Sequence, residues 1–142
     1  MSSVVGSGKF YNMGVGGTPP ANWYQPSYSD AAWTASAAPA YNYVSNGWQT
    51  PAGAAWIAQS TGSTWPDGTE VLHRRTFTLG SETVSSASLQ INVDTEVVEL
   101  YVNGSLAGGS MTGSQVGMRT LSLSASLFLP GSTNLLALRL KT

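Results

Sequence analysis

Val97-Val98-Glu99-Leu100-Tyr101-Val102-Asn103-Gly104-Ser105-Leu106 is the stretch of sequence that decides the fold. Val98, Leu100 and Val102 alternate with other residues, and Asn-Gly then leads into a further apolar residue. Asn-Gly is the pair that a type I′ turn prefers, because both central residues of that turn need positive φ. The stretch therefore predicts a β-hairpin with Asn103-Gly104 at its turn. Asn103-Gly104-Ser105 also matches a glycosylation sequon, and we interpret the same residues as the turn.

Further strand patterns flank this hairpin. Short runs in which apolar and polar residues alternate, or that are rich in β-branched and aromatic residues, occur at 71–79, 87–94, 118–123 and 134–140, with a short return strand near Leu106. Turn residues such as Gly108-Gly109 and Pro130-Gly131 separate them, and no segment keeps apolar residues at helical spacing. This pattern predicts an all-β protein, a single jelly-roll β-sandwich of antiparallel strands with an extended N-terminal arm.

The arm is predicted over residues 1–21, and the sandwich over residues 22–142. Residues 1–21 contain five glycines and Pro19-Pro20, and their apolar residues follow neither the helix nor the strand period. Such a segment has little contiguous apolar surface with which to offset the entropy of ordering. We therefore expect it to be ordered only against a neighbouring subunit, with Phe10, Tyr11 and Met13 as its apolar anchors.

Composition narrows the range of partners. The 142 residues suffice for one domain, and charged residues are only 9% of them, so Ser, Thr, Asn, Gln and Gly must supply most of the polar surface. Six Lys and Arg with a formal net charge of −1 provide no basic stripe for a phosphate backbone, so nucleic acid is not an expected partner. The sequence shows neither a signal peptide nor an apolar run of about 20 residues, so we expect synthesis in the cytoplasm and no membrane partner.

No pattern typical of catalysis or of cofactor binding occurs. There is no cysteine, and His73 is the single histidine, which makes a zinc site a poor fit. Gly-x-Ser-x-Gly and the Gly-rich nucleotide loops are missing. The acidic cluster Asp94, Glu96 and Glu99 is interpreted as a solvated strand end, with a calcium site at Asp94 or Glu96 left open. The sequence thus predicts a protein that is not an enzyme and needs no metal or cofactor.

Aromatic residues divide into two groups. Trp33 and Trp56 lie in regular motifs and are expected in the core. A second group lies among Pro, Gly and Asn in expected loops, where aromatic rings can stack on sugars or anchor a protein interface. These candidate ligand or partner residues are Trp23, Tyr24, Tyr41, Tyr43, Trp48 and Trp65.

Several motifs carry a family resemblance. They are Tyr28-Ser29-Asp30-Ala31-Ala32-Trp33, Ala55-Trp56-Ile57-Ala58, the 72–79 run Leu-His-Arg-Arg-Thr-Phe-Thr-Leu, the 89–94 run Leu-Gln-Ile-Asn-Val-Asp, the hairpin, and Leu129-Pro130-Gly131 with the strand after it. In this order they resemble the galactose-binding-domain-like jelly roll, the sugar-binding domain of family 2 glycoside hydrolases and related modules. The resemblance covers about residues 22–142. It implies a β-sandwich scaffold that serves either glycan binding or a purely structural role.

Two non-catalytic functions fit these observations. The first, which the sequence favours, is a virion structural protein, such as a phage capsid decoration (cement) protein. Its partners would be capsid subunits and other copies of itself, and the arm would join neighbouring subunits. The alternative is a carbohydrate-binding module or lectin-like protein, free or cut from a glycosidase. A particle protein could also contact host glycans.

Overall fold

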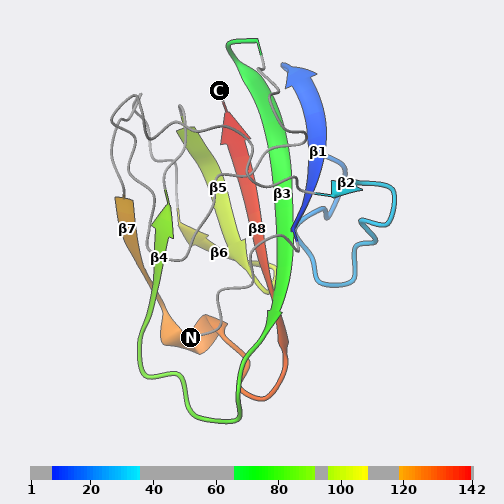
Figure 1. Ribbon diagram of the computed structural model, residues 1–142. Coiled ribbons are helices and arrows are strands. Elements are labelled where there is room, and N and C mark those ends of the chain that lie inside the picture. Colours follow the sequence, from blue (N-terminus) through cyan, green and yellow to red (C-terminus); the bar gives the residue numbers. More distant parts are fainter. Residues whose placement is uncertain (1–7, 36–65, 92–95, 109–118, 142) are drawn as a thin grey trace.

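Antiparallel strands make up nearly all of the regular structure (Figure 1). The computed structural model describes residues 8–35, 66–91, 96–108 and 119–141. Within these residues the elements are β1 (Gly8–Val15), β2 (Thr34–Ala35), β3 (Thr69–Thr78), β4 (Ala87–Ile91), β5 (Glu96–Val102), β6 (Ser105–Gly108), β7 (Arg119–Leu123), the 3-10 turn η2 (Ala125–Leu127) and β8 (Thr133–Lys141). In this part of the chain no helix has the length and apolar character needed to cross a bilayer.

The strands form two sheets. The larger has six strands in the order β2-β1-β3-β8-β5-β6, and the smaller pairs β4 with β7. All of the pairings are antiparallel, and β3 and β8 share the longest of them, from Glu70 opposite Lys141 to Thr78 opposite Thr133. The predicted all-β sandwich of antiparallel strands is confirmed.

The hairpin is confirmed at its predicted position. Val102 pairs with Ser105, which leaves Asn103 and Gly104 as the two connecting residues. Their φ angles are 51° and 84°, both positive as a type I′ turn requires. The amide of Asn103 is also fully engaged, because Nδ2 donates to Leu127 O and Asn134 Oδ1 while Oδ1 accepts from Leu135 N. These bonds support the interpretation of Asn103 as a turn residue.

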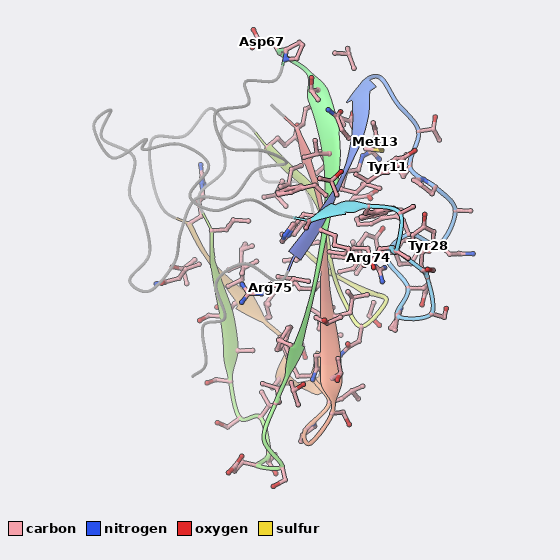
Figure 2. The ribbon with its side chains drawn as sticks, turned by 45° about the vertical axis from the view of Figure 1, so that its right-hand side comes forward. Tyr11, Met13, Tyr28, Asp67, Arg74 and Arg75 are labelled. Carbon is pink, nitrogen blue, oxygen red and sulfur yellow. The ribbon has the colours of Figure 1, made fainter. Side chains whose placement is uncertain are left out.

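Both faces of the six-stranded sheet are covered. The inner face packs on β4 and β7 through Val97, Leu100 and Leu138, with apolar residues such as Leu89 and Leu121 against them. The outer face carries a second cluster, Trp23, Trp33, Leu72, Leu135 and Ala137. It is covered by residues 20–33, which we call the cap segment. Figure 2 shows the two coverings on opposite sides of β3.

The position of strand β1 contradicts the predicted division of the chain into an arm and a sandwich. Residues 8–15 were assigned to an arm, but they form a strand that pairs with β3 from Gly8 opposite Arg75 to Val15 opposite Thr69. Phe10, expected to anchor a neighbouring subunit, is only 3% exposed and packs against the ring of His73 within its own sheet. The arm prediction is therefore wrong for these residues. The strand pattern of residues 8–15 is hard to recognise in the sequence for two reasons. Side chains on both faces of the strand contact other parts of the protein, and a β-bulge interrupts the register between Asn12 and Gly14.

Candidate functional site

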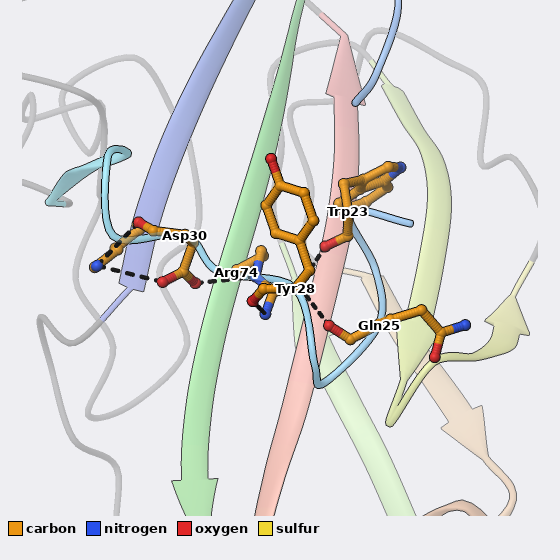
Figure 3. A network of polar contacts seen from close by, with 6 residues as sticks. Trp23, Gln25, Tyr28, Asp30 and Arg74 are labelled. Carbon is orange, nitrogen blue, oxygen red and sulfur yellow. Dashed lines mark hydrogen bonds and ion pairs between the residues drawn. The ribbon is translucent and has the colours of Figure 1, made fainter. Parts of the chain in front are cut away.

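A buried arginine organises the outer face. Arg74 lies in the middle of β3 and is 4% exposed. Its Nε donates to Asp30 Oδ2 at 2.9 Å, Nη1 donates to the carbonyl oxygens of Trp23 and Gln25, and Nη2 donates to that of Tyr28 (Figure 3). These bonds satisfy a buried cation and at the same time fix the path of the cap segment.

The ion pair below the cap segment has a second cation. Lys9 Nζ lies 3.2 Å from Asp30 Oδ1 and also donates to the backbone oxygen of Asp30 at 3.0 Å. Burial alone would raise the pKa of Asp30, but hydrogen bonds from Arg74 and Lys9 outweigh it and hold the pKa below its ordinary value of 3.8. Asp30 therefore remains a carboxylate that ties β1 and β3 to the cap segment.

Aromatic rings enclose the Arg74 guanidinium. Its central carbon lies 5.4 Å from the centre of the Tyr28 ring and 5.9 Å from that of Trp33. Trp33 is buried, as predicted, and Tyr11 stacks on it at 5.4 Å between ring centres. Because an aromatic face attracts a cation, these rings stabilise the buried charge as well as the apolar cluster.

Two tyrosines form a stacked pair at the other end of the cap segment. The rings of Tyr24 and Tyr101 are 4.2 Å apart at an interplanar angle of 12°, and both side chains are half-buried. Trp23 lies edge-on to both rings, at 5.7 Å from Tyr101 and 6.0 Å from Tyr24. We call Tyr24 and Tyr101 the tyrosine pair. It is an ordered aromatic surface that still reaches solvent.

Charged groups border the tyrosine pair. Glu99 lies on the same face of β5 as Tyr101, and Arg139 on β8 joins it at 3.7 Å while binding Glu70 at 2.6 Å. Burial raises the pKa of Tyr101, and the nearby charges of Glu99 and Tyr24 raise it further against the opposing effect of Arg139. At neutral pH the Tyr101 hydroxyl is protonated, as in an ordinary tyrosine, and it can donate a hydrogen bond.

The predicted site residues have different outcomes. Trp23 is 3% exposed, so it is a core residue and the prediction that it contacts a ligand or partner is wrong. Tyr24 is half-buried and remains a candidate. Tyr41, Tyr43, Trp48, Trp56 and Trp65 lie outside the described residues. The predicted arm anchors contact their own sheet. Met13 packs against the outer cluster and Phe10 is buried against His73, while Tyr11 is 38% exposed.

Sequence reasoning missed Arg74, Asp30 and Tyr101 as organisers of this face. Asp30 stands in a recognised motif and Tyr101 in the hairpin, but nothing in the chain marks contacts across 44 and 51 residues. One signal was present: Val71 and Leu72 put an apolar residue on each face of the strand, which indicates that both faces are covered where Arg74 follows. In the described part of the chain no group of three or more His, Asp or Glu residues could hold a metal ion.

Comparisons with known proteins identify the fold. No protein-family model matches the chain, and no curated protein does. Among solved structures, a β-glucuronidase from glycoside hydrolase family 2 matches 99% of the chain at a TM-score of 0.59 and 16% identity. A family 2 member from Bacteroides cellulosilyticus DSM 14838 matches 94% at 0.58 and 16% identity, and a Ruminococcus gnavus β-glucuronidase in complex with C6-substituted uronic isofagomine matches 86% at 0.53 and 12% identity.

These matches cover only part of the known structures. The chain spans 15% of the first of those proteins, 16% of the second and 18% of the third. At such low identity the likeness is one of fold, and it agrees with the motifs that run in the same order along the sequence. The chain has the galactose-binding-domain-like jelly-roll fold found within family 2 glycoside hydrolases.

Proposed function

We propose that this chain is a non-catalytic carbohydrate-binding domain. The observation that carries the proposal is that 99% of the chain matches a segment making up 15% of a family 2 β-glucuronidase. The chain thus resembles one part of a multidomain enzyme rather than the whole enzyme. The likeness is one of fold, and the composition of the surface supports the same function.

The surface is suited to a neutral ligand rich in hydroxyl groups. Charged residues are 9% of the chain, so few strongly hydrated groups have to be displaced when a sugar binds. The tyrosine pair adds flat apolar surface with hydroxyl groups at its edges. An aromatic face next to hydrogen-bonding groups is the combination that a pyranose ring requires, because its C–H face is apolar and its rim is polar.

Three of the described carboxylates fit structural roles better than acid–base catalysis. Asp30 is bound by Arg74 and Lys9, and Glu70 and Glu99 are bound by Arg139. A general acid in a glycosidase needs a raised pKa, whereas the pKa of Asp30 is lowered. This supports binding without hydrolysis.

A glycan array combined with a hydrolysis assay tests the proposal. Purified protein should bind a selective set of array glycans and should release no chromophore from nitrophenyl glycosides, including the β-glucuronide. If the protein still releases chromophore after a second purification, it is an enzyme and the non-catalytic assignment is wrong. An array without hits would overturn the carbohydrate-binding function.

A second candidate is the particle-surface role, in which the chain decorates a virion and contacts capsid subunits or other copies of itself. Strand β6 favours it, because it is the last strand of the described six-stranded sheet and Leu106 on it is 62% exposed. An edge strand offers backbone groups that another chain can pair with. The incorporation of residues 8–15 into the sheet weakens it, because the predicted arm anchors Phe10, Tyr11 and Met13 lie in this strand.

Native mass spectrometry separates the two candidates. The particle-surface role predicts a defined oligomer that Leu106→Lys dissociates, in a protein found with purified virions. The carbohydrate-binding role predicts a monomer that binds glycans. A monomer that does not respond to Leu106→Lys would contradict the assembly role at this edge.

A further inference from the structure

We infer that the tyrosine pair anchors a binding site for a neutral pyranose sugar on the outer face of the six-stranded sheet. The inference rests on the proposed carbohydrate-binding function and goes beyond it by naming the site and the class of sugar.

The tyrosine pair is held in place before any ligand binds. Trp23 packs edge-on against both rings, so neither ring can rotate away without losing that contact. Arg74 binds the carbonyl oxygens of Trp23 and Gln25, the residues on either side of Tyr24. A further backbone bond, from Gln25 N to Asn22 O at 2.9 Å, closes the turn. A ligand that binds such a surface loses little free energy to ordering the protein.

Hydrogen-bonding groups that could bind sugar hydroxyls lie next to the rings in the sequence and on the same strand face. The Tyr101 hydroxyl is a donor and acceptor, and Glu99 on the same face of β5 is an acceptor. Gln25 supplies an amide with a donor and an acceptor, and its side chain lies against the hairpin turn, since a Cβ on Gly104 would come within 2.5 Å of Gln25 Oε1. Both kinds of partner that a hydroxyl can use are therefore present.

The charge balance selects a neutral sugar. Glu70 and Glu99 contribute two negative charges, and the single Arg139 between them contributes one positive charge. Arg139 directs Nε and Nη2 to Glu70 at 2.6 Å, so little of its guanidinium is left for an incoming carboxylate. A uronate at this site would meet the carboxylate of Glu99, and the Arg139 guanidinium beside it is already bound by Glu70 and Glu99, which disfavours its binding.

The binding experiment uses the full chain and simple sugars as probes. Methyl β-D-glucopyranoside, methyl β-D-galactopyranoside and D-glucuronate at pH 7 are titrated into ¹⁵N-labelled protein. We expect at least one neutral glycoside to shift the signals of Tyr24, Gln25 and Tyr101, with D-glucuronate binding more weakly. Tyr24→Leu and Tyr101→Leu keep apolar bulk and should each weaken binding about tenfold or more, the effect of losing an anchoring aromatic contact.

Two further variants sharpen the test. Tyr11→Leu is the matched control, because Tyr11 is an exposed tyrosine on the same sheet face that stacks on Trp33 instead of joining the tyrosine pair, and its affinity should stay within about twofold of wild type. Glu99→Gln removes one negative charge and should narrow the preference for neutral sugar over D-glucuronate. If Tyr101→Leu fails to fold, Tyr24→Leu and Glu99→Gln decide.

The outcomes separate the site from the function. Wild-type protein that binds no glycan on the array and no probe overturns the proposed function and the inference together. If neither Tyr24→Leu nor Tyr11→Leu weakens sugar binding, the inference is overturned and the proposed function stands. The same holds if D-glucuronate binds more tightly than the neutral sugars. A dimer that Tyr24→Leu dissociates in analytical ultracentrifugation, without sugar binding, assigns the surface to a second copy of the chain and overturns both.

Discussion

His73 and Arg74 are neighbours on β3, face opposite sides of the sheet and are buried to nearly the same extent, at 5% and 4% exposed. On the outer face Arg74 finds a carboxylate and three backbone carbonyls. On the inner face His73 Nε2 is buried without a hydrogen-bond partner, as is Nε of Arg75 two residues on. Figure 2 shows Arg74 and Arg75 directed to opposite sides of the strand.

The difference between the faces lies in what covers them. The cap segment is a series of turns, which leaves backbone oxygens free to accept from a cation. Among the described residues, the inner face meets β4 and β7, which pair with each other and pack apolar side chains against it. Buried Arg74 is therefore a charged, hydrogen-bonded group on the outer face, whereas buried His73 is neutral on the inner face: burial, with a smaller contribution from the charge of Arg75, lowers the pKa of His73 to about 4.

Deleting residues 1–18 should have the largest effect, because it removes coverings from both faces at once. It takes away Phe10 from the inner face and Lys9 and Met13 from the outer face, and it leaves the edge of β3 unpaired. We expect a chain that no longer folds cooperatively, as measured by circular dichroism and thermal melting. An unchanged melting temperature of the truncated chain would mean that residues 1–18 form a separate arm that does not contribute to folding.

Arg74→Met should cost about 3–5 kcal/mol of unfolding free energy, the usual effect of breaking a buried charge pair, because the carbonyls of the cap segment and Asp30 lose their donor. Urea denaturation measures it. Arg75→Met is the matched control and should cost less than about 1 kcal/mol, because none of the described residues forms an ion pair with it and its buried Nε has no partner to lose. Equal costs for the two variants would contradict the contrast between the faces.

Acid should destabilise the inner face before it affects Asp30. The pKa of His73 is about 4 in the folded chain and about 6.5 in the unfolded chain, so the unfolded chain takes up the proton first. The folded chain is therefore most stable above pH 6.5. As the pH falls from 6.5 to 4, proton uptake by the unfolded chain lowers the free energy of unfolding, by at most about 3 kcal/mol. Asp30, whose pKa is lowered from 3.8, destabilises only at more acidic pH.

His73→Leu tests the assignment of this loss to His73. The variant should flatten the dependence of melting temperature on pH between 6.5 and 4 while leaving stability at pH 7 unchanged or higher, since an unpartnered nitrogen is replaced by an apolar group. A variant that keeps the wild-type pH profile would place the titrating group elsewhere.

Gly104→Ala should give the smallest effect and tests whether the cap segment contacts the hairpin turn. Gly104 and Gly131 both have positive φ, at 84° and 67°, so alanine is strained at either position by about 1 kcal/mol. At Gly104 the new Cβ would also meet Gln25, whereas at Gly131 the nearest atom is Ser81 Cα at 3.8 Å. Gly104→Ala should therefore lower the melting temperature more than Gly131→Ala. Equal shifts would show that Gln25 moves aside freely.

The sequence predicted those parts of the fold whose signals are local. The hairpin turn depends on Asn103-Gly104, and strands β3, β5 and β8 alternate on the scale of a few residues. Trp23 and Phe10 were misjudged because Pro and Gly around them indicate loops and arms, whereas their rings pack against β-strands distant in sequence. The tyrosine pair joins residues 24 and 101, and no spacing rule connects positions so far apart.

The bonds of Arg74 also bear on how the cap segment tolerates changes in sequence. Three of its four acceptors are backbone oxygens, which any residue at positions 23, 25 and 28 would supply, and only Asp30 contributes a side chain. The path of the chain over the outer face is therefore nearly independent of the side chains at Gln25, Ser27 and Ser29. Substitutions at these positions can change the chemistry displayed on this surface while the backbone keeps its course, which makes the cap segment a natural place for selection or engineering to alter recognition.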